Sequence, residues 1–240
     1  MNITWPGPGK YIVAVSGGVD SACLLDMLAK HDGYELIVAH VDHGIRSDSS
    51  LDAKLVRELA EKNKFNFVIT LLSLDKNASE EELRKARYSF LFDEMRKHGA
   101  QAIITAHHAD DVLETSIMNI GRGTDRYGAA GGMNREGIIR PLLGVRKSEL
   151  IKYARANQLV WREDSTNTSI AYTRNKIRYE VIPHIDRQTY QEHLSQLQGL
   201  NKNIDAELKG LVSVKNKRVE LRRADLSKLG VRELEVLLAY

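Results

Sequence analysis

The chain has 240 residues, of which 42% are hydrophobic and 28% are charged, a composition typical of a globular protein with one full core and a smaller second unit. Its single cysteine, Cys23, excludes an intramolecular disulfide and a CxxC site, and it favours a reducing compartment, the cytoplasm. No apolar run approaches the roughly 18 residues of a membrane helix, and the N-terminus lacks the layout of a secretory signal, so we expect the protein to start at Met1.

The net charge of +3 is distributed unevenly along the chain. Between residues 122 and 180, twelve Lys and Arg stand against six Asp and Glu, which gives this stretch +6 and leaves −3 for the remainder. A basic zone on a nearly neutral chain indicates a polyanionic partner. A solvated face with scattered arginines is the alternative.

Five apolar, β-rich runs each precede an amphipathic stretch. The predicted strands are 11–16, 34–42, 65–73, 100–108 and 137–143, and the predicted helices are 22–31, 51–64, a long helix from 79, 110–120 and 147–158. Ser79 and Glu82 have the spacing of a capping box at the start of the third helix. Continuous apolar strands alternating with helices predict an α/β fold, a doubly wound parallel five-stranded sheet with right-handed crossovers.

The strand–helix alternation stops after about residue 144. We expect a helix over 174–181, capped by Ser165 or Thr168, then a helix from 189, a strand-like piece at 212–223 and a final amphipathic stretch. The predicted domains are a catalytic domain, 1–188, and a small, mostly helical unit, 189–240. The sequence stops in mid-pattern, so this second unit is either minimal or truncated.

The junction after the first strand reads Ser16-Gly17-Gly18-Val19-Asp20-Ser21. Adjacent glycines allow the backbone to approach a ligand closely, and the free N–H groups and positive end of the following helix point to one place. This arrangement predicts an anion cradle, with phosphate as the anion. The loop has neither the lysine of a Walker motif nor the spacing of a dinucleotide fingerprint. For a Gly-Gly pair alone, a tight turn is the simpler interpretation.

The full six-residue pattern, SGGxDS after a first strand, resembles the N-type PP-loop ATP pyrophosphatases. That resemblance implies a PP-loop (Rossmann-like) fold and ATP as the nucleotide, with Ser16 to Ser21 around its β- and γ-phosphates. The α-phosphorus is then attacked by an oxygen, AMP is transferred and pyrophosphate leaves. Two hydroxyls and a carboxylate in the first helical turn suit a Mg²⁺-bound pyrophosphate.

Four further stretches narrow the resemblance. They are VDHGIRSDS at 41–49, TAHHADDVLET at 105–115, RPLL at 140–143 and EDSTNTSIAYTRNKIRYEVIP at 163–183. In this order they resemble the tRNA(Ile)-lysidine synthase family, over about residues 10–185. The resemblance implies a ligase that joins lysine to C2 of the wobble cytidine of the CAU-anticodon isoleucine tRNA through an adenylated intermediate. Codon reading changes from AUG to AUA, and AMP and pyrophosphate are released.

The resemblance also assigns roles to single residues. Asp20 and Asp111 are candidates for holding Mg²⁺ or positioning the reactants, and His107 for stabilising the α-phosphate or carrying the proton. Asp111 would take the proton of the lysine amine, with Asp110 and Glu114 as competitors. Arg46 joins the predicted nucleotide site, and the predicted tRNA contacts are Arg122, Arg174, Asn175 and Arg178. Taken singly, each has a simpler explanation as a strand-end, helix-cap or solvated residue.

Several alternatives remain open. A zinc site built from His40, Asp42 and His43, or from the histidines and aspartates of 107–111, is disfavoured because the chain has no cysteines beside them. The glycine-rich segment 121–133 predicts a mobile loop over the site, but Asp125 and Tyr127 stand where the family has small or apolar residues. The competing functions are tRNA cytidine thiolation by another PP-loop transferase and a non-catalytic ATP-binding module. The expected partners are tRNA and free lysine; whether the protein is a homodimer is open.

Overall fold

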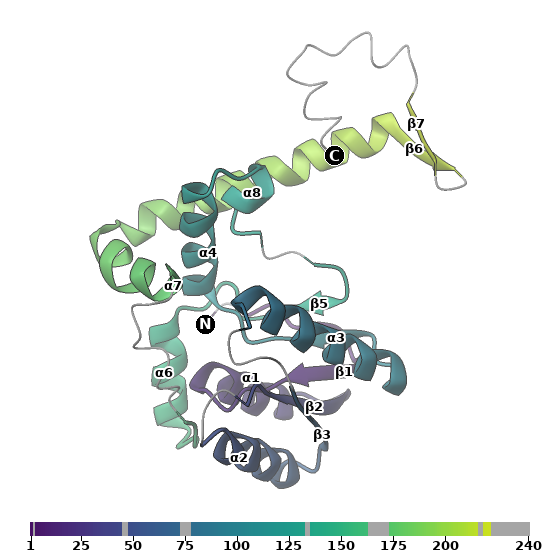
Figure 1. Cartoon of the computed structure of the whole chain (residues 1–240). Helices are drawn as coiled ribbons and strands as arrows, with labels where there is room; N and C mark the ends of the chain where they lie inside the picture. The colour runs from purple at the N-terminus through teal and green to yellow at the C-terminus, as the bar shows by residue number, and fades with distance from the viewer. Residues whose placement is uncertain are drawn as a thin grey trace. The chain divides into compact units, whose positions relative to one another are not determined.

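The structure is a computed structural model that describes residues 1, 3–44, 48–72, 78–132, 135–162, 173–215 and 218–221 (Figure 1). By internal contacts the chain divides into two compact units. The first comprises Met1–Glu114 and Met133–Lys176, and the second comprises Thr115–Gly132 and Ile177–Tyr240. This division differs from the predicted boundary at residue 188, which follows sequence pattern rather than contacts and stays a prediction.

A five-stranded sheet with the order β3-β2-β1-β4-β5 forms the centre of the first unit, and all four strand pairs are parallel. The strands are β1 (Gly9–Ala14), β2 (Tyr34–Asp42), β3 (Asn66–Leu71), β4 (Ala102–Ile104) and β5 (Ile138–Ile139). The predicted doubly wound α/β fold is therefore confirmed. β4 and β5 are shorter than predicted: residues 105–108 turn into the next helix, and Pro141 has no N–H with which to continue the ladder.

Helices cover both faces of this sheet (Figure 1). They are α1 (Val19–Ala29), α2 (Ser49–Lys62), α3 (Glu80–His98) and α6 (Lys147–Ala156), whereas α4 (Ala109–Gly121) begins in the first unit and continues into the second. Successive residues of β1 alternate between two cores, because side chains of a strand point to opposite faces. Val13 packs in the core that α1, α2 and α6 share, whereas Ile12 packs in the core that contains Tyr88 and Leu91 of α3.

The ends of α3 follow the chemistry expected from the sequence. Ser79 Oγ accepts from the backbone N–H of Glu82, and the Ser79 N–H donates to Glu82 Oε2 at 2.8 Å, so the predicted capping box is confirmed. At the other end Gly99 adopts φ +62°, a left-handed conformation in which glycine is favoured.

The segment after α6 leads through a short helix, α7 (Thr173–Lys176), into the second unit. That unit contains α5 (Arg126–Ala129), the π-helical turn η2 (Ile177–Val181), the 3₁₀ turn η3 (Ile182–His184), α8 (Arg187–Leu211), β6 (Val212–Lys215) and β7 (Arg218–Leu221). The predicted helix over 174–181 is thus helical but changes type at residue 177. The predicted strand-like piece is an antiparallel hairpin. The proposed caps Ser165 and Thr168, and the final amphipathic stretch, lie outside the described residues.

The glycine-rich segment is more ordered than its composition predicts. Asp125 caps the one-turn helix α5 by accepting from the Gly128 N–H at 2.8 Å. Arg126 Nη2 and the Tyr127 hydroxyl both donate to Asp205 of α8, at 2.7 and 2.5 Å. The two departures from the family pattern, Asp125 and Tyr127, therefore help to stabilise this segment within the second unit.

Among the helices of the described ranges, none has the length and apolar character of a membrane span.

Candidate active site

The loop between β1 and α1 has the geometry of an anion cradle. Gly17 adopts φ +93°, which a side chain would make strained, whereas Gly18 has an ordinary φ of −75°. Only the first glycine is therefore required by backbone conformation. Gly18 is the N-cap of α1 and supplies no side-chain cap, so it leaves the approach to the helix N-terminus open to a ligand.

Two serines tie this loop together. Ser21 Oγ donates to the Gly18 carbonyl at 3.0 Å and accepts from the Ser16 N–H at 3.2 Å. The Ser16 and Ser21 hydroxyls lie 3.2 Å apart, and Ser16 itself is exposed. Among the described residues, no acceptor is found for the first-turn N–H groups of Val19, Asp20 and Ser21. These groups form the positive surface that phosphate oxygens favour.

A second set of polar groups follows β4, at the same edge of the sheet. His107 is half-buried, and its Nδ1 lies 2.8 Å from Thr105 Oγ1. Burial lowers the pKa of His107 to about 4, and the charges of Arg140, Arg87 and Arg174 act in the same direction, against Asp111. The imidazole is therefore neutral at pH 7 and can act as a hydrogen-bond partner rather than as a cation.

The loop and the β4–α4 junction meet at His108. Its Nε2 lies 3.6 Å from Asp20 Oδ2 and 3.5 Å from Asp111 Oδ2, and the imidazole is buried. Burial alone would lower the pKa of His108, but the close polar contact with Asp20 and the charges of Asp20 and Asp111 raise it. The two predicted catalytic carboxylates are thus brought together around one ring nitrogen, on a histidine to which the sequence reasoning gave no role of its own.

Lys147, the first residue of α6, completes this group of charges. Its Nζ donates to both carboxylate oxygens of Asp20, at 2.7 and 2.6 Å. Burial would raise the pKa of Asp20, but His108 and Lys147 together hold it below its ordinary value. Asp110 accepts from the backbone N–H of Lys147 at 2.8 Å, so it positions α6. In the sequence, Lys147 is marked only as the first residue of the predicted helix 147–158 that follows the fifth strand.

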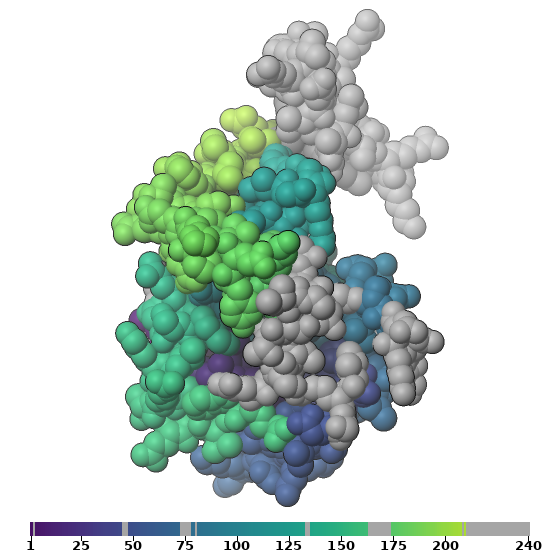
Figure 2. All heavy atoms as spheres, turned by 60° about the vertical axis from the view of Figure 1, so that its left-hand side comes forward, coloured from purple at the N-terminus to yellow at the C-terminus, as the bar shows by residue number. Residues whose placement is uncertain are grey.

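Arg162 contacts both the loop between β1 and α1 and the helix α2. Its backbone N–H donates to the Gly17 carbonyl at 3.0 Å, while its guanidinium bridges Asp52 and Asp48, each at 2.7 Å. Asp52 is only 6% exposed, and a Cβ on Gly17 would lie 3.6 Å from Asp52 Cβ. Figure 2 shows the teal-green residues around 160 at the surface next to the dark-blue α2.

Three arginines act electrostatically on His107: Arg87, Arg140 and Arg174. Arg87 of α3 and Arg140 after β5 both have a pKa lowered first by burial, and both act on His107. Arg174 Nε lies 3.1 Å from Glu114 Oε2, a carboxylate that is 1% exposed. The motif analysis missed Arg87 because it lies in α3, away from the strand ends.

The remaining predicted residues are distributed over both units. Asn175, in α7 of the first unit, is buried. Arg122 is exposed directly after α4, and Arg178 lies in η2, both in the second unit. Arg46 lies outside the described residues. His40, a proposed zinc ligand, is buried, and its Nδ1 lies 2.8 Å from the Val15 carbonyl.

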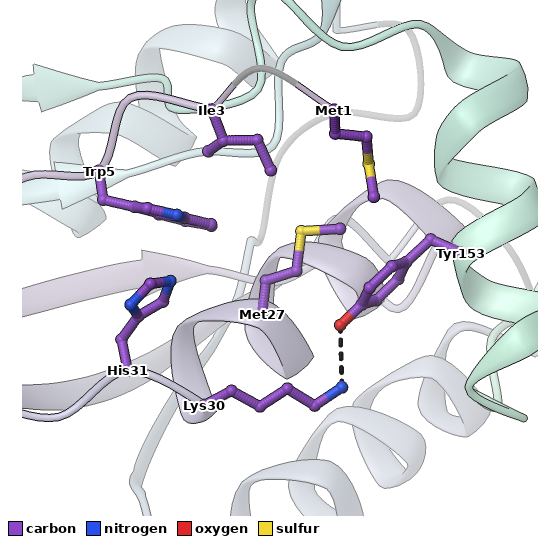
Figure 3. Close-up of a pocket in the computed structure, with 7 residues that line it drawn as sticks. All are labelled: Met1, Ile3, Trp5, Met27, Lys30, His31 and Tyr153. Carbon is purple, nitrogen blue, oxygen red and sulfur yellow. Dashed lines mark hydrogen bonds between the residues drawn. The ribbon is translucent and has the colours of Figure 1, made fainter.

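A separate cavity of about 320 Å³ lies at the opposite end of α1 from the loop (Figure 3). It is lined by Met1, Ile3, Trp5, Met27, Lys30, His31 and Tyr153. The Lys30 ammonium donates to the Tyr153 hydroxyl at 2.9 Å and to Asp26, so its charge is already paired. This cavity is not part of the candidate active site.

The residues present fit Mg²⁺ better than zinc. Within the described ranges, no three His, Cys, Asp or Glu side chains are grouped as a metal site of their own. Asp20 and Asp111 supply two carboxylates near one point, and Mg²⁺ is commonly held by one or two carboxylates, with nucleotide phosphates and water as its other ligands.

Solved structures show the same fold. The U34-tRNA thiolase NcsA from Methanococcus maripaludis superposes with a TM-score of 0.64, at 18% sequence identity, over 78% of this chain and 72% of that one.

Curated relatives are more similar in sequence. The tRNA(Ile)-lysidine synthases of Thermus thermophilus, Petrotoga mobilis and Solibacter usitatus are 42%, 39% and 37% identical, over 74%, 72% and 73% of this chain. The chain spans 36%, 59% and 41% of the length of these relatives, respectively. The sequence pattern of the PP-loop domain matches residues 4–185. The chain therefore belongs to the family of ATP-utilising PP-loop domains.

Proposed function

We propose that the protein is an ATP-dependent ligase that joins lysine to C2 of the wobble cytidine in a CAU-anticodon isoleucine tRNA. The observation that carries this proposal is the meeting of Asp20 and Asp111 at His108, beside the open N-terminus of α1. A phosphate cradle next to paired carboxylates suits a reaction in which a nucleotide is activated and a proton is then removed. The lysidine synthase relatives support the same reaction.

In the first step, the C2 carbonyl oxygen of cytidine attacks the α-phosphorus of ATP. An oxygen–phosphorus bond forms, the bond from that phosphorus to the bridging oxygen breaks, and pyrophosphate leaves. The first-turn amides of α1 would hold the leaving pyrophosphate. His107, neutral at pH 7, would bind the α-phosphate as a hydrogen-bond partner, and Arg87 and Arg140 would supply positive charge there.

In the second step, the ε-amine of lysine attacks C2 and the C2–O bond breaks, which releases AMP. Lysine's amine has an ordinary pKa of about 10.4, so at neutral pH it arrives mostly as an ammonium. We assign the removal of its proton to Asp111, which has one carboxylate oxygen facing His108. Glu114 is the weaker candidate because it is buried and paired with Arg174.

Mg²⁺ bound by Asp20 and Asp111 would neutralise charge on the phosphates. The Lys147 ammonium and the nearby His108 imidazole lower the pKa of Asp20, so they favour its ionised form, and Lys147 holds the carboxylate in place.

We assign tRNA contacts to Arg122 and Arg178 in the second unit and to Arg174 and Asn175 in the first. Arg122 is exposed, as a phosphate contact requires, and the four residues fall in the basic zone of 122–180. Because Arg174 binds Glu114 and Asn175 is buried, we expect these two to position their neighbours.

One assay separates this function from its alternatives. The protein is incubated with ATP, Mg²⁺, labelled lysine and bulk tRNA, and we expect label in tRNA with equal release of AMP and pyrophosphate. A thiolase would release AMP without incorporating lysine, and a binding module would release neither. The thiolase is also disfavoured chemically, because burial raises the pKa of Cys23, the only thiol, to about 12. We also propose that the protein acts in the cytoplasm.

Substitution of Asp111 removes the proposed proton acceptor of the second step and one of the two proposed Mg²⁺ ligands. Asp111→Asn should abolish lysine incorporation, whereas exchange of labelled pyrophosphate into ATP in the presence of tRNA, which reports adenylation, should fall far less, because Asp20 would still hold the metal. Asp110→Asn is the matched control, since an amide oxygen can still accept from the Lys147 N–H. Normal incorporation by Asp111→Asn would remove this residue from the mechanism.

A further inference from the structure

Arginines gather around one buried aromatic ring in the first unit. Tyr88 of α3 is 2% exposed, and the guanidinium carbons of Arg135, Arg87 and Arg84 lie 4.8, 5.3 and 5.8 Å from its ring centroid. Arg135 also lies 5.2 Å from the ring centroid of Phe92. With Arg140, which acts on the same ring, these residues form what we call the Tyr88 arginine cluster: Arg84, Arg87, Arg135 and Arg140.

The crowding of positive charges in this cluster destabilises the folded protein. Arg84 and Arg87 lie three residues apart on α3, a spacing at which like charges repel. The charge of Arg84 also contributes to the lowered pKa of both Arg87 and Arg140, after the larger effect of burial. Cation–π contact with Tyr88 offsets part of this cost. A bound anion would remove the repulsion altogether.

Several acidic side chains of α3 pair with other basic residues. Ion pairs join Lys85 to Glu81, Arg96 to Asp93 and Lys97 to Glu94. None of these three pairs includes Arg84 or Arg87. Arg84 and Arg135 are exposed, so their charges face solvent.

The cluster leads from the surface to the candidate active site. Arg84 and Arg135 are exposed, whereas Arg87 and Arg140 are half-buried and act electrostatically on His107. An extended polyanion bound at the two exposed arginines would continue toward the reacting phosphate. A free triphosphate is the less suitable ligand for Arg84 and Arg135, because its phosphates are already assigned to the N-terminus of α1 and to the groups around His107.

We propose that Arg84 and Arg135 bind backbone phosphates of the RNA substrate and so direct one of its nucleotides toward His107. This proposal rests on the proposed function. The two arginines would set the position in which the RNA substrate of that reaction is held. Phosphate contacts of this kind fix position without reading sequence. Tyr88 and Phe92 provide the surface on which the two guanidinium groups lie.

The test compares Arg84→Gln/Arg135→Gln with the wild-type chain. Binding of a labelled transcript of CAU-anticodon isoleucine tRNA is measured by anisotropy over a series of salt concentrations. Two lost phosphate contacts should weaken binding at low salt by about tenfold or more and lower the slope of log K against log salt by roughly 1.5–2. The KM for ATP should stay within about twofold of wild type.

Arg57→Gln is the matched control. Arg57 is also an exposed arginine over an aromatic ring, 4.8 Å from the centroid of Phe67, but it lies on α2. It should leave both the affinity and the salt slope unchanged, and thermal unfolding should confirm that all variants are folded.

The outcomes keep the two proposals apart. If the wild-type chain binds the transcript and the double variant shows the same salt slope as the wild type, the role of the cluster is overturned and the proposed function stays intact. A raised KM for ATP with an unchanged slope also overturns it, in favour of a nucleotide role. Failure of the wild-type chain to bind or modify the transcript contradicts the proposed function itself.

Discussion

Lys147 donates through Nζ to both carboxylate oxygens of Asp20, at 2.7 and 2.6 Å, and so joins the first turn of α6 to the first turn of α1. The two residues are separated by 127 positions in the sequence. Their side chains are 38% and 27% exposed, so the pair contributes little to stability by itself. Its consequence is electrostatic: Asp20 stays ionised and fixed beside the phosphate cradle.

Lys147→Gln should therefore impair activity more than folding. Loss of the ammonium removes one of the two groups that lower the pKa of Asp20, and it removes the hydrogen bonds that hold the carboxylate in place. We expect kcat/KM for ATP in the lysine incorporation assay to fall about tenfold or more, with a change in unfolding free energy of at most about 1 kcal/mol. Lys147→Arg, which keeps the charge, should recover most of the activity. Equal activity of the Gln variant and the wild type would contradict this role.

The pKa of His107 predicts a specific pH dependence. Because its folded pKa of about 4 lies below the ordinary value of 6.5, the unfolded chain binds a proton between these values that the native chain does not. Stability should thus be complete above pH 6.5 and fall as the pH decreases toward 4. Urea unfolding of wild type and His107→Gln across this range would show the difference, since the variant should lose this part of the slope. An NMR titration midpoint of His107 near 6.5 would refute the prediction.

Arg162 is expected to act on nucleotide binding through the loop. Arg162→Met removes the guanidinium that donates to the buried Asp52 carboxylate, which should cost about 1–3 kcal/mol of unfolding free energy, and it should raise the KM for ATP several-fold. Asp52→Asn/Arg162→Met also removes the carboxylate charge and should regain stability but not ATP affinity. Unchanged ATP affinity in both variants would show that Arg162 has only a structural role.

Asp205 is expected to hold the glycine-rich segment in the second unit. Its carboxylate accepts from Arg126 and from Tyr127, and the hydrogen bond from Tyr127, followed by the charge of Arg126, lowers its pKa. Asp205→Asn should weaken both contacts and increase hydrogen exchange of the α5 amides by about tenfold, with little effect on the first unit. Glu207→Gln, on the same helix, serves as the control.

The fold of the first unit could be predicted because its signals are local and repeated. Apolar strands followed by amphipathic helices, the Ser79 capping box and the junction at Gly17 all depend on neighbouring residues. Strand ends were less predictable: β5 stops before Pro141, where an apolar run suggested continuation. The segment 121–133 was predicted to be mobile because of its glycines, and the sequence could not reveal its stabilising partner, Asp205, because that residue lies far away in the chain.

The site was predicted in part for the same reason. Asp20 and Asp111 belong to motifs at strand ends, so the sequence could place them at one edge of the sheet. That His108 is the point where they meet depends on side-chain direction in three dimensions. Lys147 and Arg162 approach from other segments, and no spacing in the sequence relates them to the loop.

The hydrogen bond from the Arg162 N–H to the Gly17 carbonyl also bears on how the protein is made. On the ribosome, Gly17 emerges long before Arg162, and at about 5–20 residues per second the interval is roughly 7 to 30 seconds. During that time the nascent chain carries a complete SGGxDS motif, but the hydrogen bond between the Arg162 N–H and the Gly17 carbonyl has not yet formed. Arrested chains that stop short of residue 162 should therefore fail to retain ATP, although every residue of the motif has already been translated.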